Sequence, residues 1–240
     1  MTAPTRSLAA LLAVLLAGAS ASRAGDPLLR VGDRIAIFGD SISTGKGYGP
    51  FAVELLKQEQ PGLGLEWIEH GHPGWTAEHA LTVVADLIEK KPTLVTLMWG
   101  TNDLGYQGAR GAAEIKERLR ALVEPLRKAG IRVVLLTTPY TGNAGIFARE
   151  LNRSALPRMG EDIVALGREL DVPVFDMFAF MKQADQDGRA ADPDFLMFNS
   201  PGDCHPNGLG HRLMGRALAD FLLGKSDVEH VPFTWTYTGK

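Results

Sequence analysis

A serine stands directly after an apolar, strand-like run near the start of the chain. The run 34–39 reads RIAIFG and leads into Asp40 and Ser41, within the stretch GDSISTG. A serine hydroxyl becomes a useful nucleophile when a base takes its proton, and free N–H groups of a following helix would stabilise a developing anion. The same two residue types also favour a plain strand-to-helix turn. This stretch alone therefore leaves both interpretations open.

The best candidate for the base is His205, which lies in the loop DCHPN ahead of a helix-like stretch. Its imidazole can accept the serine proton and return it to a leaving group. The chain contains five other histidines, His70, His72, His79, His211 and His230. His79 and His211 fall within helix-like stretches, which favours packing or surface roles, whereas His70 and His72 flank a second loop and could line a site.

Two more loops carry hydrogen-bond donors of the kind that acyl transfer requires. The loop GHPGWT contains Gly74, and the loop WGTND contains Asn102. A backbone N–H from Gly74, the side-chain amide of Asn102 and the N–H of Ser41 could together bind the oxyanion of a tetrahedral intermediate. For the Asn-Asp pair, a turn at the end of a strand is the alternative interpretation.

These loops are separated by alternating strand-like and helix-like stretches. The strand-like runs are 34–39, 65–71, 93–100, 132–139 and 172–178, and the helix-like stretches are 49–60, 76–91, 111–130, 152–170 and 207–224. The alternation predicts right-handed crossovers and a doubly wound parallel α/β sheet with helices on both faces. Ligands of such sheets bind beyond the carboxyl ends of the strands, which is where the candidate residues fall.

Four blocks, GDSISTG, PGWT, GTND and DCHPN, resemble in order and spacing those of the GDSL esterases, also called SGNH hydrolases. The resemblance extends over nearly all of the chain after residue 24. It implies a flavodoxin-like, three-layer α/β/α sandwich with a five-stranded parallel sheet, and no metal or organic cofactor. It also implies that Ser41 is the nucleophile, that Gly74 and Asn102 are oxyanion donors and that His205 is the base.

The acid of the site departs from the family pattern. The family usually places it three residues before the histidine, a position that Gly202 occupies here, whereas Asp203 stands two residues before His205. An acid orients the imidazole and stabilises the imidazolium, and loops of somewhat different geometry can supply it. We predict that Asp203 has this role. Asp192, Asp194 or a backbone carbonyl remain as alternatives.

Two residues adjacent to the candidate nucleophile and base could support other chemistry. Cys204 could be a reactive thiol, and Asp40 could bind a metal ion together with Asp103 and His205, as in a phosphoesterase. Because the serine already supplies a nucleophile, we predict that Cys204 is a small buried filler. Because no second cluster of His and Asp supports a metal site, we predict that the two aspartates hold turns and loops.

The first 24 residues have the pattern of a cleaved signal peptide. One early arginine precedes an apolar run over 8–19, and small residues follow it. The run is shorter than a bilayer span requires, and a buried N-terminal helix is the alternative interpretation. We expect export to the periplasm or the outside of the cell, one hydrolase domain over 25–225, and a tail over 226–240 to which the pattern assigns no role.

Composition excludes some classes of partner. Without residues 1–24 the chain has 23 Lys and Arg against 28 Asp and Glu, a net charge of about −5, and no basic cluster. We therefore expect no nucleic-acid surface. The single cysteine excludes an intramolecular disulfide, and no stretch after residue 24 is long and apolar enough to span a membrane. The sequence indicates nothing about oligomeric state.

Together these features predict a serine esterase that hydrolyses carboxylic esters through an acyl-enzyme. We expect a small acyl group, such as acetyl, on a carbohydrate or similar alcohol. Trp75, Trp99 and Tyr106 lie beside the candidate loops and could stack on a sugar ring, although the two tryptophans could equally pack the loops. A lipolytic esterase or lysophospholipase with the same residues is one alternative, and a catalytically silent carbohydrate-binding relative is another.

Overall fold

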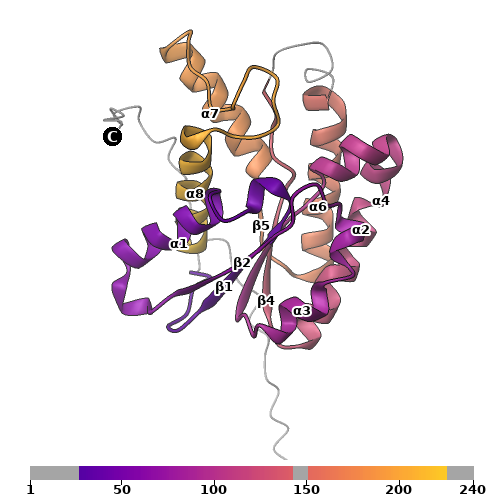
Figure 1. Cartoon of the computed structure of the whole chain (residues 1–240), viewed down its shortest axis with the longest axis vertical. Helices are drawn as coiled ribbons and strands as arrows, with labels where there is room; N and C mark the ends of the chain where they lie inside the picture. The colour runs from indigo at the N-terminus through magenta and orange to yellow at the C-terminus, as the bar shows by residue number, and fades with distance from the viewer. Residues whose placement is uncertain (1–26, 143–150, 226–240) are drawn as a thin grey trace, which may run out of the picture.

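The computed structural model describes residues 27–142 and 151–225, which form a single parallel sheet between helical layers (Figure 1). The strands are β1 (Arg34–Gly39), β2 (Glu66–Gly71), β3 (Leu94–Met98), β4 (Arg132–Leu136) and β5 (Val174–Phe175). All are parallel, in the order β2-β1-β3-β4-β5. The predicted five-stranded α/β/α sandwich is confirmed. The predicted signal peptide and tail lie outside the described residues.

The helices fall into two layers. The helices are α1 (Tyr48–Glu59), α2 (Ala77–Ala80), α3 (Val84–Glu89), α4 (Thr101–Lys128), α6 (Leu156–Leu170), α7 (Met177–Ala191) and α8 (Gly208–Leu222). Helices α1 and α8 pack together on one face of the sheet, and α2, α3, α4 and α6 cover the other (Figure 1). Among the described residues, no helix has both the length and the apolar character needed to cross a membrane.

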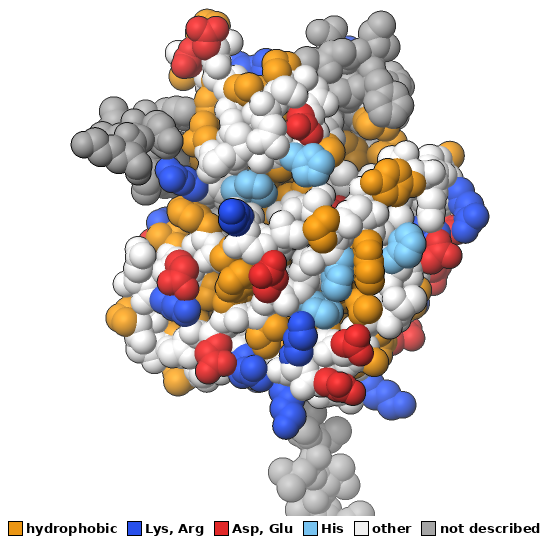
Figure 2. All heavy atoms as spheres, viewed as in Figure 1, with side chains coloured by type: hydrophobic (Ala, Val, Ile, Leu, Met, Phe, Trp, Pro, Cys, Tyr) orange, Lys and Arg blue, Asp and Glu red, His pale blue; other side chains and the backbone are white. Residues whose placement is uncertain are grey.

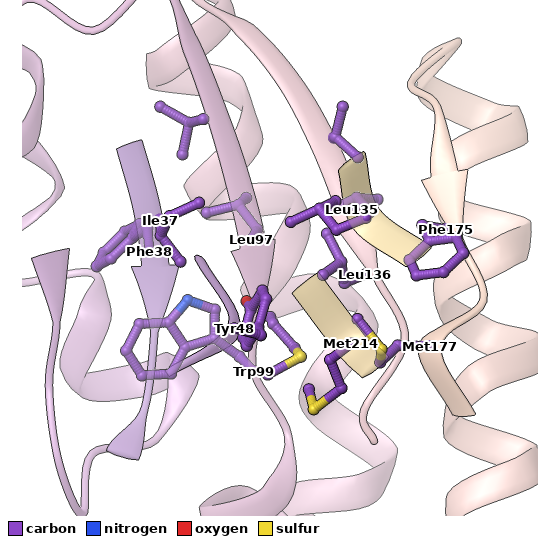
Figure 3. Close-up of a cluster of buried hydrophobic side chains, with 14 of the residues drawn as sticks. Ile37, Phe38, Tyr48, Leu97, Trp99, Leu135, Leu136, Phe175, Met177 and Met214 are labelled. Atoms are coloured by element: carbon purple, nitrogen blue, oxygen red, sulfur yellow. The ribbon is translucent and has the colours of Figure 1, made fainter. Parts of the chain in front are cut away.

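The strands carry near-continuous apolar side chains because both faces of the sheet are covered. Every residue of β3 is buried, and four consecutive residues of β1, Ile35 to Phe38, have no exposed surface. Figure 3 shows how side chains from the strands meet those of the covering helices, such as Tyr48 from α1 and Met214 from α8. Burial of one such large side chain contributes about 1.5–3 kcal/mol.

Three elements differ from the prediction. The stretch 76–91 forms two short helices, α2 and α3, instead of one continuous helix. Helix α4 begins at Thr101, ten residues earlier than expected, and contains a non-helical residue at Gly108. The stretch 172–178 gives only two strand residues, because the Asp176 side chain accepts the N–H of Ala179 and starts α7.

The order of the strands places a topological switch point beside β1. From β1 the chain crosses to β2 on one side, and then returns to β3 on the other side. Loops that leave β1 and β3 therefore diverge at this topological switch point, where open α/β sheets bind their ligands. Ser41 and Asn102 follow these two strands.

Candidate active site

A tight turn places Ser41 at the carboxyl end of β1. Asp40 caps the short 3-10 turn that begins at Ser41, and its Oδ1 accepts the N–H of Ile42 at 3.0 Å. Gly39 allows the close approach that this turn requires, since a Cβ there would stand 2.2 Å from Ser43 Oγ. The apolar strand and the polar turn thus bring the serine to the topological switch point.

The loop before α8 presents His205 to this serine. Asn207 caps α8 by accepting the N–H groups of Leu209 and Gly210, and its amide nitrogen donates to the carbonyls of Leu196 and Phe198. The loop is therefore fixed on both sides of the imidazole. His205 Nε2 lies 3.0 Å from Ser41 Oγ, within hydrogen-bond reach.

Asp203 completes a line of three side chains. Its Oδ1 lies 3.1 Å from His205 Nδ1 and also accepts the backbone N–H of His205 at 2.9 Å. Burial opposes ionisation of Asp203, but the backbone N–H and the ring of His205 outweigh it and hold the pKa of Asp203 below its ordinary value. The carboxylate of Asp192, one of the alternative acids, instead accepts the N–H of Asp194.

The loop after β2 meets the start of α4. Gly74 has a φ of +76°, a conformation that favours glycine, and Asn102 lies in the first turn of α4. Asn102 Nδ2 donates to the carbonyl oxygen of Trp75 at 2.8 Å, which leaves the second amide N–H for another acceptor. His72 donates its backbone N–H to Gly39 and joins this loop to the end of β1. Three of the predicted loops are therefore in direct contact.

Asp40 is buried directly beneath the nucleophile, with 1% of its surface exposed. Burial raises its pKa to about 6, and the Ile42 N–H offsets only part of that effect. The pKa of Asp40 is thus close to neutral pH. Its contacts are those of a turn-holding residue, as predicted for it.

The thiol of Cys204 lies 3.5 Å from His205 Nδ1, on the same side of the ring as Asp203. Burial raises the pKa of Cys204 to about 11, and the carboxylates of Asp203 and Asp40 add to the effect. The group is therefore a neutral thiol at pH 7 and a poor nucleophile. Among the described residues, Asp203, Cys204 and His205 form the one group of potential metal ligands, with ligand atoms within 4.8 Å of one another.

The other described histidines differ in their surroundings. Figure 2 shows histidine side chains, in pale blue, gathered on the face that it draws. Burial, followed by the charge of nearby Lys90, lowers the pKa of His70 to about 4, and the same causes lower the pKa of His72. His79 belongs to the capping box at the start of α2, and His211 is largely buried in α8. His230 lies outside the described residues.

The three aromatic residues have different surroundings. Trp75 is half-buried and stacks on His72, with ring centroids 4.4 Å apart. Tyr106 is 70% exposed, and its hydroxyl lies 3.9 Å from where a Cβ on Gly74 would stand. Trp99 is only 1% exposed and packs edge-on against Phe38. The prediction that Trp99 lines the substrate site is therefore wrong, because its ring belongs to the core.

Sequence reasoning missed one residue that touches the site's framework. Arg118 lies in α4 with an 8% exposed side chain and pairs with Asp103, the neighbour of Asn102, at 2.6 Å. The sequence offered a weak signal, since Arg118 follows Ile115 and precedes Leu119 within the apolar pattern of the helix. Only the folded geometry shows what it contacts.

The chain is similar to known proteins at the levels of family, sequence and fold. Residues 37–213 match the model of the GDSL-like lipase/acylhydrolase family. The uncharacterized lipoprotein YqeF of Bacillus subtilis (strain 168) is 27% identical over 215 residues, which cover 78% of this chain and 88% of that protein.

Two solved structures illustrate the likeness in fold. A variant of Axe2, an acetyl xylan esterase from Geobacillus stearothermophilus, superposes with a TM-score of 0.66 at 21% identity, over 81% of this chain and 96% of its own. LAE5, an alpha/beta hydrolase enzyme from the metagenome of Lake Arreo, Spain, gives a TM-score of 0.68 at 19% identity, over 83% and 99%.

Proposed function

Because the chain belongs to the GDSL-like lipase/acylhydrolase family, it is a carboxylic ester hydrolase, and we propose that it removes small acyl groups from a carbohydrate or similar alcohol. The acyl group that we propose is acetyl, transferred first to Ser41. The observation that carries the proposed transfer to Ser41 is the hydrogen-bonded line from Ser41 through His205 to Asp203, with distances of 3.0 and 3.1 Å.

The proposed reaction has two halves. In the first, His205 Nε2 takes the proton of Ser41 as Oγ attacks the ester carbonyl, and the resulting imidazolium then protonates the leaving alcohol. In the second, His205 takes a proton from the water that attacks the acyl carbonyl, and the imidazolium then returns a proton to Ser41 Oγ as the bond from Oγ to the acyl carbon breaks and the acid leaves. The carboxylate of Asp203 stabilises the imidazolium in both halves, since it accepts the Nδ1–H bond.

The tetrahedral intermediate of each half carries a negative charge on the former carbonyl oxygen. We propose that the N–H groups of Ser41 and Gly74 and the amide of Asn102 bind this oxyanion. Donors of this kind, held in place before the reaction, each contribute roughly 10²–10³ in rate. The contact of Asn102 with Trp75 supports this assignment, because it fixes the amide beside the loop of Gly74.

Two observations support a small acyl group on a carbohydrate. The exposed ring of Tyr106 and the half-buried ring of Trp75 flank Gly74, where an apolar sugar face could stack. The fold is also shared with acetyl xylan esterases. A lipolytic enzyme would instead use this surface for a longer acyl chain.

We also propose that the protein is exported. The pattern of residues 1–24 supports export, and so does the similarity to a bacterial lipoprotein.

A series of p-nitrophenyl esters from C2 to C12, together with acetylated xylo-oligosaccharides, tests the proposal. We expect kcat/KM to be highest for C2 and to fall steeply by C8, with acetate released from the oligosaccharides. The Ser41→Ala variant should remain folded and lose turnover by more than about 10³-fold.

The same preparation should react with a fluorophosphonate probe at Ser41. An optimum at C8–C12 would favour the lipolytic esterase instead. A folded wild-type protein that neither hydrolyses the esters nor reacts with the probe would favour the silent carbohydrate-binding relative.

A further inference from the structure

The loop that carries Gly74 is attached to α4 at two neighbouring points. Asn102 holds the carbonyl of Trp75, and Asp103, which is fully buried, accepts the N–H of Ala77 at 3.0 and 3.2 Å through its two oxygens. Ala77 is the first residue of α2. Two consecutive residues of α4 therefore fix the loop on the C-terminal side of Gly74.

Asp103 is itself held by the buried guanidinium of Arg118. One nitrogen of Arg118 donates to Asp103 Oδ1 and to Gln107 Oε1, both at 2.6 Å. The other nitrogen donates to Glu78 of α2 at 3.1 Å and to Glu114 at 2.6 Å. A planar fork of donors suits such a set of acceptors. Arg118 thus contacts both sides of the junction between α2 and α4.

This contact depends on a bend in α4. Residues 103 and 118 are 15 positions apart, which corresponds to roughly 22 Å along a straight helix, far beyond the reach of a side chain. Gly108 has φ 56° and ψ −135°, so the helix folds back there. The close approach that results leaves no space at Gly111, where a Cβ would stand 2.0 Å from the carbonyl oxygen of Asp103.

We propose that Arg118 is a positioning residue for the oxyanion donors, acting through Asp103 to hold Gly74 and Asn102 in register. It touches no reacting atom. The inference rests on the proposed esterase function, in which these two residues bind the oxyanion. A small displacement of one donor would weaken the transition state more than the ground state, because the charge on the oxygen develops only during the reaction.

The first test does not depend on turnover. Hydrogen exchange of the backbone amides of Gly74, Trp75 and Ala77 is measured in the wild type and in Arg118→Met, with Arg120→Met as the matched control. Arg120 lies on the same helix and pairs with Glu117 and Glu169, away from this junction. We expect exchange in the loop to be at least about tenfold faster in Arg118→Met, and unchanged in Arg120→Met.

The second test is kinetic and uses p-nitrophenyl acetate. We expect Arg118→Met to lower kcat by roughly 10–100-fold with KM within about twofold, since small misplacement of reacting groups can cost that much. In an Asn102→Ala background the same substitution should cost less than about threefold, because one of the donors that it aligns is gone. A role in stability alone predicts the same fractional loss in both backgrounds.

Arg118→Lys covers the case in which Arg118→Met does not fold. It keeps the positive charge but cannot form the fork, and we expect an intermediate loss of kcat. Unchanged loop exchange together with a kcat within twofold of wild type, in either folded variant, would overturn the proposal. Faster loop exchange in a protein that hydrolyses no ester would instead refute the proposed function and leave the structural link intact.

Discussion

Asp203 reaches His205 from an unusual place in the sequence. One oxygen accepts both the backbone N–H and the Nδ1–H of the residue two positions later, so the acid and base close a small ring within one loop. The difference from the family spacing is therefore absorbed by local geometry, and the line to Ser41 is kept. The altered motif therefore does not mean that the site has lost its acid.

Asp203→Asn should lower kcat by roughly 10²–10⁴-fold while KM changes little, because an amide cannot stabilise the imidazolium. Steady-state kinetics with p-nitrophenyl acetate measure the loss. Asp192→Asn is the matched control, since the Asp192 carboxylate bonds to the N–H of Asp194 instead, and it should retain near wild-type turnover. Equal losses in the two variants would count against Asp203 as the acid.

At the scale of elements, the bend in α4 depends on a glycine with a backbone conformation that other residues rarely adopt. Gly108 has a positive φ with a strongly negative ψ, whereas Gly105, one turn earlier, has no such strain and open space around its Cβ position. The two glycines therefore serve different purposes within one helix.

Gly108→Ala should destabilise the protein by about 1–3 kcal/mol, because a Cβ strains this conformation. Gly105→Ala should stabilise it by about 0.5–1 kcal/mol, because alanine favours the helix interior. Urea unfolding curves of the two variants and the wild type provide the comparison. A stabilised Gly108→Ala variant would show that α4 does not need the bend.

The elements also show which parts of the structure were predictable. Strands β1 and β3 were predicted because nearly continuous apolar runs reflect burial on both faces, and Ile115, Leu119, Leu122 and Leu126 of α4 are buried as their spacing indicates. The positions of Ser41, Gly74 and Asn102 after strands β1, β2 and β3 followed from the parallel sheet and the sequence blocks, whereas Asp203 and His205 lie in the loop between α7 and α8.

The remaining features depend on tertiary contacts that no local pattern contains. Helix α4 continues through Gly105, which has low helix propensity, and folds back at the non-helical Gly108, where the pair of Arg118 and Asp103 ties its two parts together. Trp99 follows a buried strand and is itself buried, so its side chain packs in the core, whereas the sequence suggested contact with a ligand. The pairing of Arg118 with Asp103 links residues too far apart for a periodicity to reveal.

At the scale of the whole molecule, buried and half-buried histidines make stability sensitive to acid. The pKa values of His70, His72 and His211 are all lowered, with burial as the first cause. A histidine that is neutral in the folded state and charged when unfolded adds stability above about pH 6.5, and this contribution is lost as the pH falls. Asp40, whose pKa is raised to about 6, acts in the opposite direction as the pH falls.

The shifts of His70 and Asp40 are similar in size and opposite in effect, so the lowered pKa values of His72 and His211 decide the sign, and the urea midpoint should fall between pH 7 and pH 5. His70, whose pKa is lowered to about 4, should account for a loss on the order of 1 kcal/mol. The His70→Phe variant, which keeps an aromatic ring beside Phe38, should therefore lose less stability over the same interval. Identical pH dependence in the two proteins would exclude this role for His70.

The two ends of the described chain lie together. Helix α8 packs on α1, and the N–H of Leu28 donates to the carbonyl of Leu222. The serine and its base are 164 residues apart. At usual rates of translation, roughly 10–30 s pass between the synthesis of one and of the other. A growing chain therefore carries an inert serine until His205 has been added, and a chain that stops before His205 has the proposed nucleophile but not the base proposed to activate it.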